Sequence, residues 1–180
     1  MAALRMLIAV LLVAAAAPGD GGRLAPEAPA ARPDAFSLEL NYWGNPMISW
    51  RVGSDGKGEY RLAAQAPSGR FQDYDVSTRR FDAGPAGFER VHTILDDVAR
   101  RAPPELPCHD QVTDMPYGQV NWHRGSAMAG LGFNLGCRDD LAQQIMARLR
   151  EATALVESWA SSQPVAEVSH VRGGTSPGPS

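Results

Sequence analysis

The chain has 180 residues, with 17 basic and 20 acidic side chains and a formal net charge of −3 at neutral pH. A protein that binds nucleic acid through surface charge normally carries a basic stripe, and this sequence has none, so we predict no nucleic-acid partner. The length and the hydrophobic fraction of 44% suffice for one domain with a substantial core.

The chain begins with the sequence MAALRMLIAVLLVAAAAPGD. An arginine precedes an apolar run from Met6 to Ala17, and Pro18 and Gly19 follow it. This pattern is typical of a cleaved secretory signal peptide, and the run is too short to span a bilayer comfortably. We predict a signal peptide over residues 1–17 and a periplasmic or secreted protein with no membrane span after cleavage. An uncleaved N-terminal anchor is the alternative.

Two segments rich in Pro, Ala and Gly flank the predicted domain. The composition of residues 18–34 predicts a flexible tether, and that of residues 162–180 predicts a disordered tail. Neither segment can bury enough apolar surface to offset the entropy lost on ordering. We therefore predict a single globular domain over residues 35–161.

Three stretches that alternate between apolar and polar residues follow the predicted tether. They read FSLELNYW, MISWRV and EYRLAA, and the turn residues GNP and GSDGKG separate them. Such alternation predicts half-buried antiparallel strands joined by hairpins. Turns at residues 44–46 and 55–57 would keep the apolar rows on one face, because a slip of one residue would turn a row outward.

The register that follows from these turns places side chains in rows. The predicted core row consists of Leu40, Trp50 and Leu62. The predicted row on the opposite face consists of Glu39, Arg51 and Arg61. Glu39 can offset the charge of Arg51, which leaves Arg61 available. The two arginines are therefore candidates for binding a small anion, and a solvated row of salt bridges is the alternative interpretation.

The remaining elements complete an α+β pattern. DYDVSTRRF predicts a fourth strand, and GPAGFERVHTILDDVARRA has apolar residues at helical spacing. YGQVNWH and MAGLGFNLG predict a second hairpin, and RDDLAQQIMARLREATALVESWA predicts a long amphipathic helix. We predict an antiparallel sheet of about five or six strands with both helices packed on one face. The other face would be partly wet, and we expect a partner to dock there.

The stretch PCHDQVTDMPYGQVNWH places a Cys, two His and two Asp close together. Cys108 and Cys137 are the two cysteines of the chain, and an even number in an exported protein favours a disulfide. That bond would remove the best metal ligand, and structural zinc sites usually show two closely spaced ligand pairs. We predict no metal and no cofactor, with a site of His109, Asp110 and His123 as the alternative.

The second predicted hairpin offers a candidate binding strip on its outward face. One strand presents hydrogen-bonding side chains, namely Tyr117, Gln119, Asn121 and His123. The other strand presents little more than backbone, at Gly130, Gly132, Asn134 and Gly136. Glycine inside a strand often marks close approach of a ligand or another backbone. A neighbouring loop packed on the strip is an equally good explanation.

The sequence also contains residues that a hydrolase would need, without a distinctive motif. The pattern GxSxG is absent, and Ser126 lies in a predicted hairpin turn where serine is ordinary. An enzyme that hydrolyses envelope material would be centred on His123, with Asn121 and Gln119 beside it. Such an enzyme should show a concave pocket and a carboxylate near the histidine.

The order of elements over residues 36–160 resembles that of a group of small exported bacterial domains of uncharacterised function. The residues that carry the resemblance are Asp55-Gly56 in the first set of turns, and Thr113-Asp114 with Pro116 before the second strand pair. The resemblance implies an α+β fold and export, and it implies no catalytic residues. We therefore interpret the chain as an exported, non-catalytic binding domain with a partner in the cell envelope or outside the cell.

Overall fold

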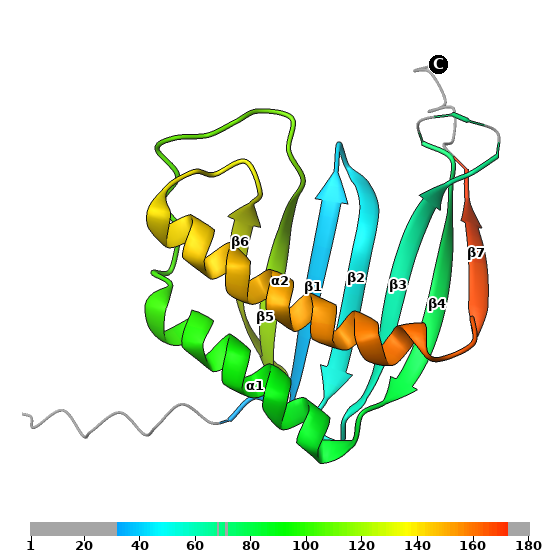
Figure 1. Cartoon of the computed structure of the whole chain (residues 1–180), viewed down its shortest axis with the longest axis horizontal. Helices are drawn as coiled ribbons and strands as arrows, with labels where there is room; N and C mark the ends of the chain where they lie inside the picture. Colours follow the sequence, from blue (N-terminus) through cyan, green and yellow to red (C-terminus); the bar gives the residue numbers. More distant parts are fainter. Residues whose placement is uncertain (1–31, 68, 71, 173–180) are drawn as a thin grey trace, which may run out of the picture. The chain divides into compact units, whose positions relative to one another are not determined.

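The computed structural model describes residues 32–67, 69–70 and 72–172 (Figure 1). The predicted signal peptide and residues 18–31 of the predicted tether lie outside the described residues. The elements, in chain order, are β1 (Ala35–Tyr42), β2 (Asn45–Gly53), β3 (Lys57–Gln65), β4 (Tyr74–Asp82), α1 (Gly84–Arg101), β5 (Tyr117–Arg124), β6 (Ala127–Asn134), α2 (Asp140–Ser161) and β7 (Glu167–Val171).

The described strands form one antiparallel sheet of seven, in the order β6-β5-β1-β2-β3-β4-β7. Both helices lie across the same face of this sheet, with α1 and α2 side by side (Figure 1). The predicted α+β class is confirmed. The predicted count of five or six strands is too low, because β7 was not anticipated. We call the face of the sheet that is opposite the helices the outer face.

Strand β7 lies inside the segment that we predicted to be a disordered tail. It pairs with β4 along its whole length, from Thr78 opposite Glu167 to Tyr74 opposite Val171. Four of its five residues are exposed. Because the strand is held by main-chain pairing at a sheet edge rather than by burial, an apolar pattern could not reveal it.

The last residues of the predicted tether are also tied to the domain. The backbone N–H of Asp34 donates to the carbonyl of His123 at 2.9 Å, and the N–H of Ser54 donates to the carbonyl of Asp34 at 2.7 Å. Pro33 is buried. The ordered domain therefore begins before Ala35, where the composition still resembles a linker.

The predicted faces of the first three strands are confirmed, but their predicted register is wrong by two residues. Trp50 lies opposite Leu38 and Tyr60 rather than opposite Leu40 and Leu62. The turn between β1 and β2 is formed by Trp43 and Gly44 and is combined with a β-bulge after Leu40, so the hairpin closes on a different pair. A shift by two residues keeps every side chain on its face, which is why the alternation did not detect it.

The corrected register changes the outer face. Arg51 lies between Ser37 and Glu59, whereas Arg61 lies opposite Ser49 in the next row. The predicted row of Glu39, Arg51 and Arg61 therefore does not exist. The two arginines are on the same face but in different rows, and Glu59 follows Arg51 in its row.

The hydrophobic core lies between the sheet and the two helices. Phe36 stacks on Phe88 with ring centroids 5.1 Å apart. The indole N–H of Trp50 donates to the hydroxyl of Thr153 at 3.1 Å, so the central row of the sheet is in direct contact with α2. Leu62 is 44% exposed, although we predicted it in the core, because it lies one row beyond the row that α2 covers.

The helix stripes follow the predicted spacing closely. In α1 the predicted apolar residues are all buried, namely Phe88, Val91, Leu95 and Val98. In α2 the buried members of the predicted stripe are Ile145, Leu149, Ala152 and Val156. Leu141 and Trp159, at the two ends of that stripe, are only partly buried against the core.

The turn between β1 and β2 generates a prediction about stability. Trp43 and Gly44 both have positive φ, of 50° and 76°, as in a type I′ turn, in which Asn-Gly is preferred. A bulky residue is disfavoured in this conformation, and Trp43 is 60% exposed, so its ring contributes little burial. We expect Trp43→Asn to raise the free energy of unfolding by about 1 kcal/mol in urea titrations. A loss of stability would show that the indole ring supports the fold.

Candidate functional site

His123 on β5 lies at the centre of the best-connected polar cluster on the outer face. Its Nε2 atom is 2.9 Å from the hydroxyl of Ser37 on β1 and 3.1 Å from Nη1 of Arg51 on β2. Ser37 is the register partner of Arg51 on one side and of Asn121 on the other. Because β1 runs between β2 and β5, it brings together residues that are 72 or more positions apart in the chain.

Burial and the contact with Arg51 both favour the neutral form of the His123 imidazole. A guanidinium group can only donate hydrogen bonds, so Nε2 of His123 must accept and must carry no proton. Burial lowers the pKa of His123, and the positive charge of Arg51 lowers it further, while the carboxylate of Asp34 acts in the opposite direction. His123 is therefore neutral at pH 7, and the hydroxyl of Ser37 can donate to the same nitrogen.

The predicted amides extend this cluster along β5. Nε2 of Gln119 donates to Oδ1 of Asn121 at 2.9 Å, and Nδ2 of Asn121 is 3.4 Å from the hydroxyl of Ser37. Asn121 is 8% exposed, so its amide is largely withdrawn from solvent. The hydrogen bonds form one directed chain from Gln119 through Asn121 and Ser37 to His123.

Of the glycines in the predicted strip, Gly136 is covered by a neighbouring loop, because a Cβ atom there would meet the carbonyl oxygen of Val112 at 2.2 Å. Gly130 and Gly132 pair with Asn121 and Gln119, as the predicted strip requires. A Cβ atom at Gly130 would meet the side chains of Gln119 and Asn121 at 2.3 and 2.6 Å, so those side chains fill the space. Gly132 has open space above it. Neither a loop nor a ligand is needed to explain Gly130.

A depression of about 500 Å³ on the outer face collects most of the predicted binding residues. Those that line it are Arg51, Arg61, Gln119, Asn121 and His123. Ser37, Ser49 and Glu59 line it as well, and sequence reasoning missed them because their place depends on the register of β1 with two neighbours. Tyr117 and Asn134 lie elsewhere, in a separate hollow that also contains Trp43.

Some of the charged side chains that line the depression form ion pairs and others do not. Glu59 accepts hydrogen bonds from Arg80 at 3.1 Å and from Arg61 at 3.3 Å, and these contacts lower its pKa. Arg51 also lies opposite Glu59 in the register, yet among the described residues its guanidinium contacts only the neutral imidazole of His123. Arg51 thus presents a positive charge that no carboxylate of the described residues pairs with.

The predicted disulfide between Cys108 and Cys137 is present, with the two Cα atoms 5.5 Å apart. The loop is held a second time by Asp139, the residue before α2. Its carboxylate accepts from the backbone N–H groups of His109 and Asp110 at 2.9 and 3.1 Å, and it lies 2.8 Å from Nδ1 of His109. These contacts, led by the backbone N–H of His109, lower the pKa of Asp139.

The alternative metal site is not assembled in the described part of the chain. No group of three or more His, Cys, Asp or Glu side chains that could hold a metal ion occurs among those residues. Cys108 is bonded to Cys137, and His109 is engaged with Asp139. The stretch that contains these residues therefore serves to attach the long loop before β5 to the start of α2.

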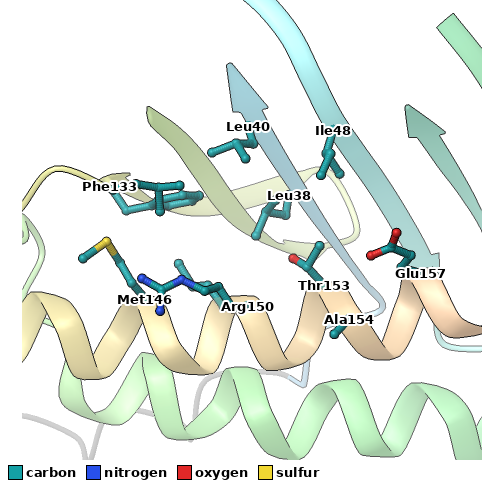
Figure 2. Close-up of a pocket in the computed structure, with 11 residues that line it drawn as sticks. Leu38, Leu40, Ile48, Phe133, Met146, Arg150, Thr153, Ala154 and Glu157 are labelled. Carbon is teal, nitrogen blue, oxygen red and sulfur yellow. The ribbon is translucent and has the colours of Figure 1, made fainter. Parts of the chain in front are cut away.

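The helix-bearing face has a hollow of a different character. It has a volume of about 190 Å³ and lies between α2 and the strands (Figure 2). Leu38, Leu40 and Ile48 form its sheet side, and Arg150 and Glu157 are charged residues of α2 that border it (Figure 2). The hollow continues the core where α2 leaves Leu40 and Ile48 only partly buried. It contains no connected set of polar groups comparable to that around His123.

Comparison with protein-family models and with curated proteins found no match. Among the described residues, no helix is long and apolar enough to cross a membrane. The interpretation of the site therefore depends on its own geometry.

The contact between Arg51 and His123 can be tested by titration. Replacing Arg51 with Met removes a positive charge that disfavours the imidazolium, so we expect the pKa of His123 to rise toward its ordinary value of 6.5. NMR titration of the His123 ring measures this change. Arg90→Met, an exposed site on α1, is the matched control and should leave the pKa unchanged. An unaltered pKa in Arg51→Met would contradict the proposed coupling.

The same depressed pKa fixes the sign of a pH effect on stability. Between the folded pKa and the unfolded value near 6.5, the unfolded chain binds more protons at His123 than the folded chain does. The contribution of His123 to stability is thus fully present above that window and is lost as the pH falls through it. In Arg51→Met this loss should be smaller.

Proposed function

We propose that the chain is an exported, non-catalytic binding domain whose outer face binds an anionic group of a partner in the cell envelope or outside the cell. The observation that carries the proposal is the charge of Arg51, which among the described residues contacts only a neutral imidazole. In a depression that is already lined by hydrogen-bonding groups, such a guanidinium favours a carboxylate or phosphate group.

The surroundings of Arg51 limit the size of the anion. Glu39 is exposed and lines the same depression one row from Arg51, opposite Gln119 and Ser49. Its carboxylate has no ion pair among the described residues, and it would repel a second negative group placed beside the first. The depression therefore suits a single anionic group rather than an extended polyanion such as nucleic acid.

A hydrolase is the second candidate function, because Ser37 and His123 are 2.9 Å apart, within the range of a nucleophile and its base. Two features weigh against it. Arg51 donates to the nitrogen that would have to accept the proton of Ser37, which makes it a weaker base. Among the described residues, no carboxylate hydrogen-bonds Nδ1 of His123, and the carboxylate of Asp34 accepts from the N–H of Gly125 at 2.5 Å instead. Binding is therefore the better supported function.

Titration with inorganic phosphate tests the anion site directly. We expect saturable NMR shifts of the His123 ring and a rise in its pKa, because a bound anion offsets the charge of Arg51. The apparent affinity should fall as sodium chloride is added, since the contact is exposed. Arg51→Met should abolish the saturable response, and Arg90→Met should retain it. An equal response of Arg51→Met and the unchanged protein would refute an anion site at Arg51.

Export is supported by the apolar run at residues 6–17 and by the disulfide, which forms and persists in oxidising compartments. The test is the intact mass of untagged protein recovered from a bacterial periplasm without reductant. We expect a chain that begins at residue 17 or 18 and that is lighter by two hydrogens than its reduced form. A full-length chain, or one with two free thiols, would contradict export with cleavage.

A further inference from the structure

Another hollow lies at the end of the sheet where β1 turns into β2. It has a volume of about 390 Å³ and is lined by Trp43, Gly44, Asp114, Met115, Tyr117 and Asn134. The register explains why segments from distant parts of the chain meet there. Asn41 near the end of β1 pairs with Tyr117, and Tyr117 pairs with Asn134 at the end of β6. Trp43 follows the end of β1, and Asp114 precedes the start of β5.

Trp43 is not explained by the fold. Its side chain is 60% exposed, and its backbone has a φ of 50°, which a bulky residue adopts at a cost. Its nearest ring is that of Tyr42, edge-on at a centroid distance of 6.5 Å. A large aromatic side chain that is neither buried nor suited to its turn is a candidate for binding.

Asp114 supplies the charge of the hollow. Its φ is 59°, and among the described residues its carboxylate has no hydrogen bond or ion pair. No basic residue lines the hollow. The side-chain oxygen of Asn134 already accepts from the N–H of Gly136 at 2.7 Å. The hollow is thus acidic and aromatic.

We propose that this hollow binds an organic cation, an alkylammonium group, between Trp43, Tyr117 and Asp114. Ammonium groups are attracted by the faces of Trp and Tyr rings, and a carboxylate adds direct charge complementarity. The thioether of Met115 is a polarizable, apolar contact that suits the methyl or methylene groups around the nitrogen. An anion would be repelled by Asp114.

This site is distinct from the anion site at Arg51. The two hollows share no lining residue, and arginines line only the hollow that contains Arg51. Arg51→Met should therefore leave cation binding unchanged, and the failure of one site would say nothing about the other.

Choline is the first probe, and 3,3-dimethyl-1-butanol, which has nearly the same shape without the charge, is its neutral control. Titration of the disulfide-bonded protein, followed by calorimetry and by the fluorescence of the exposed Trp43, should show saturable choline binding. We expect the neutral analogue to bind at least tenfold more weakly, because it lacks the cation–π and carboxylate attraction. Nα-acetyl-lysine amide, titrated in parallel, distinguishes a primary ammonium from a quaternary one.

Three variants complete the test. Trp43→Asn removes the ring while suiting the turn, and Asp114→Asn removes the charge while keeping a residue that tolerates positive φ. Each should weaken choline binding by about tenfold or more, whereas Trp43→Phe should retain part of it. The melting temperature of each variant shows that the fold is kept. Equal binding of choline and its neutral analogue, or unchanged affinity in both Trp43→Asn and Asp114→Asn, would overturn the proposal.

Discussion

The pairing of β1 with two neighbours is the constraint on which the rest of the structure depends. β1 hydrogen-bonds to β2, its partner in a local hairpin, and to β5, which begins about 75 residues further along the chain. Because side chains alternate strictly along each strand, this single register places Phe36 and Leu38 in the core. It also places Ser37 between Arg51 and Asn121 on the outer face. A slip of β1 by two residues would preserve the core face and dismantle the cluster around His123.

This dependence explains which parts of the molecule could be predicted. Alternation and helical spacing report burial, so the strand faces, the buried stripe of α1 and the α+β class followed from the sequence. The placement of Gln119 and Asn121 beside the glycines of β6 on one face also followed, because alternate residues of two paired strands share a face. Register in the first hairpin did not follow. The bulge after Leu40 and the turn at Trp43 shift it by an even number of residues, which leaves the pattern of burial unchanged.

The long-range contacts could not be predicted from the sequence, and the reason is different. Nothing local indicates that β1 rather than β4 lies beside β5, so Ser37 could not be recognised as the partner of His123. β7 was missed because an edge strand with exposed side chains is specified by its neighbour, here β4, and not by its own apolar residues. The disulfide was predictable from the number of cysteines, whereas the anchoring of His109 by Asp139 was not.

Three hollows among the described residues differ in how well their lining residues agree with local structural preferences. Around the hollow on the helix-bearing face, apolar residues occupy strand and helix positions that favour them, as expected for the margin of a core. Around His123 the uncharged polar groups hydrogen-bond to one another, whereas Arg51 and Glu39 have no ion-pair partner among the described residues. At the β1–β2 turn, Trp43 departs from the preferred residue of its turn, and its ring gains no burial in return. Departures from local preference without a gain in stability are expected at functional positions, because there the residue is retained for what it contacts. The alternate residues of β5 run from Tyr117, which lines the hollow at the β1–β2 turn, to His123 beside Arg51, so both hollows lie on the outer face of the sheet.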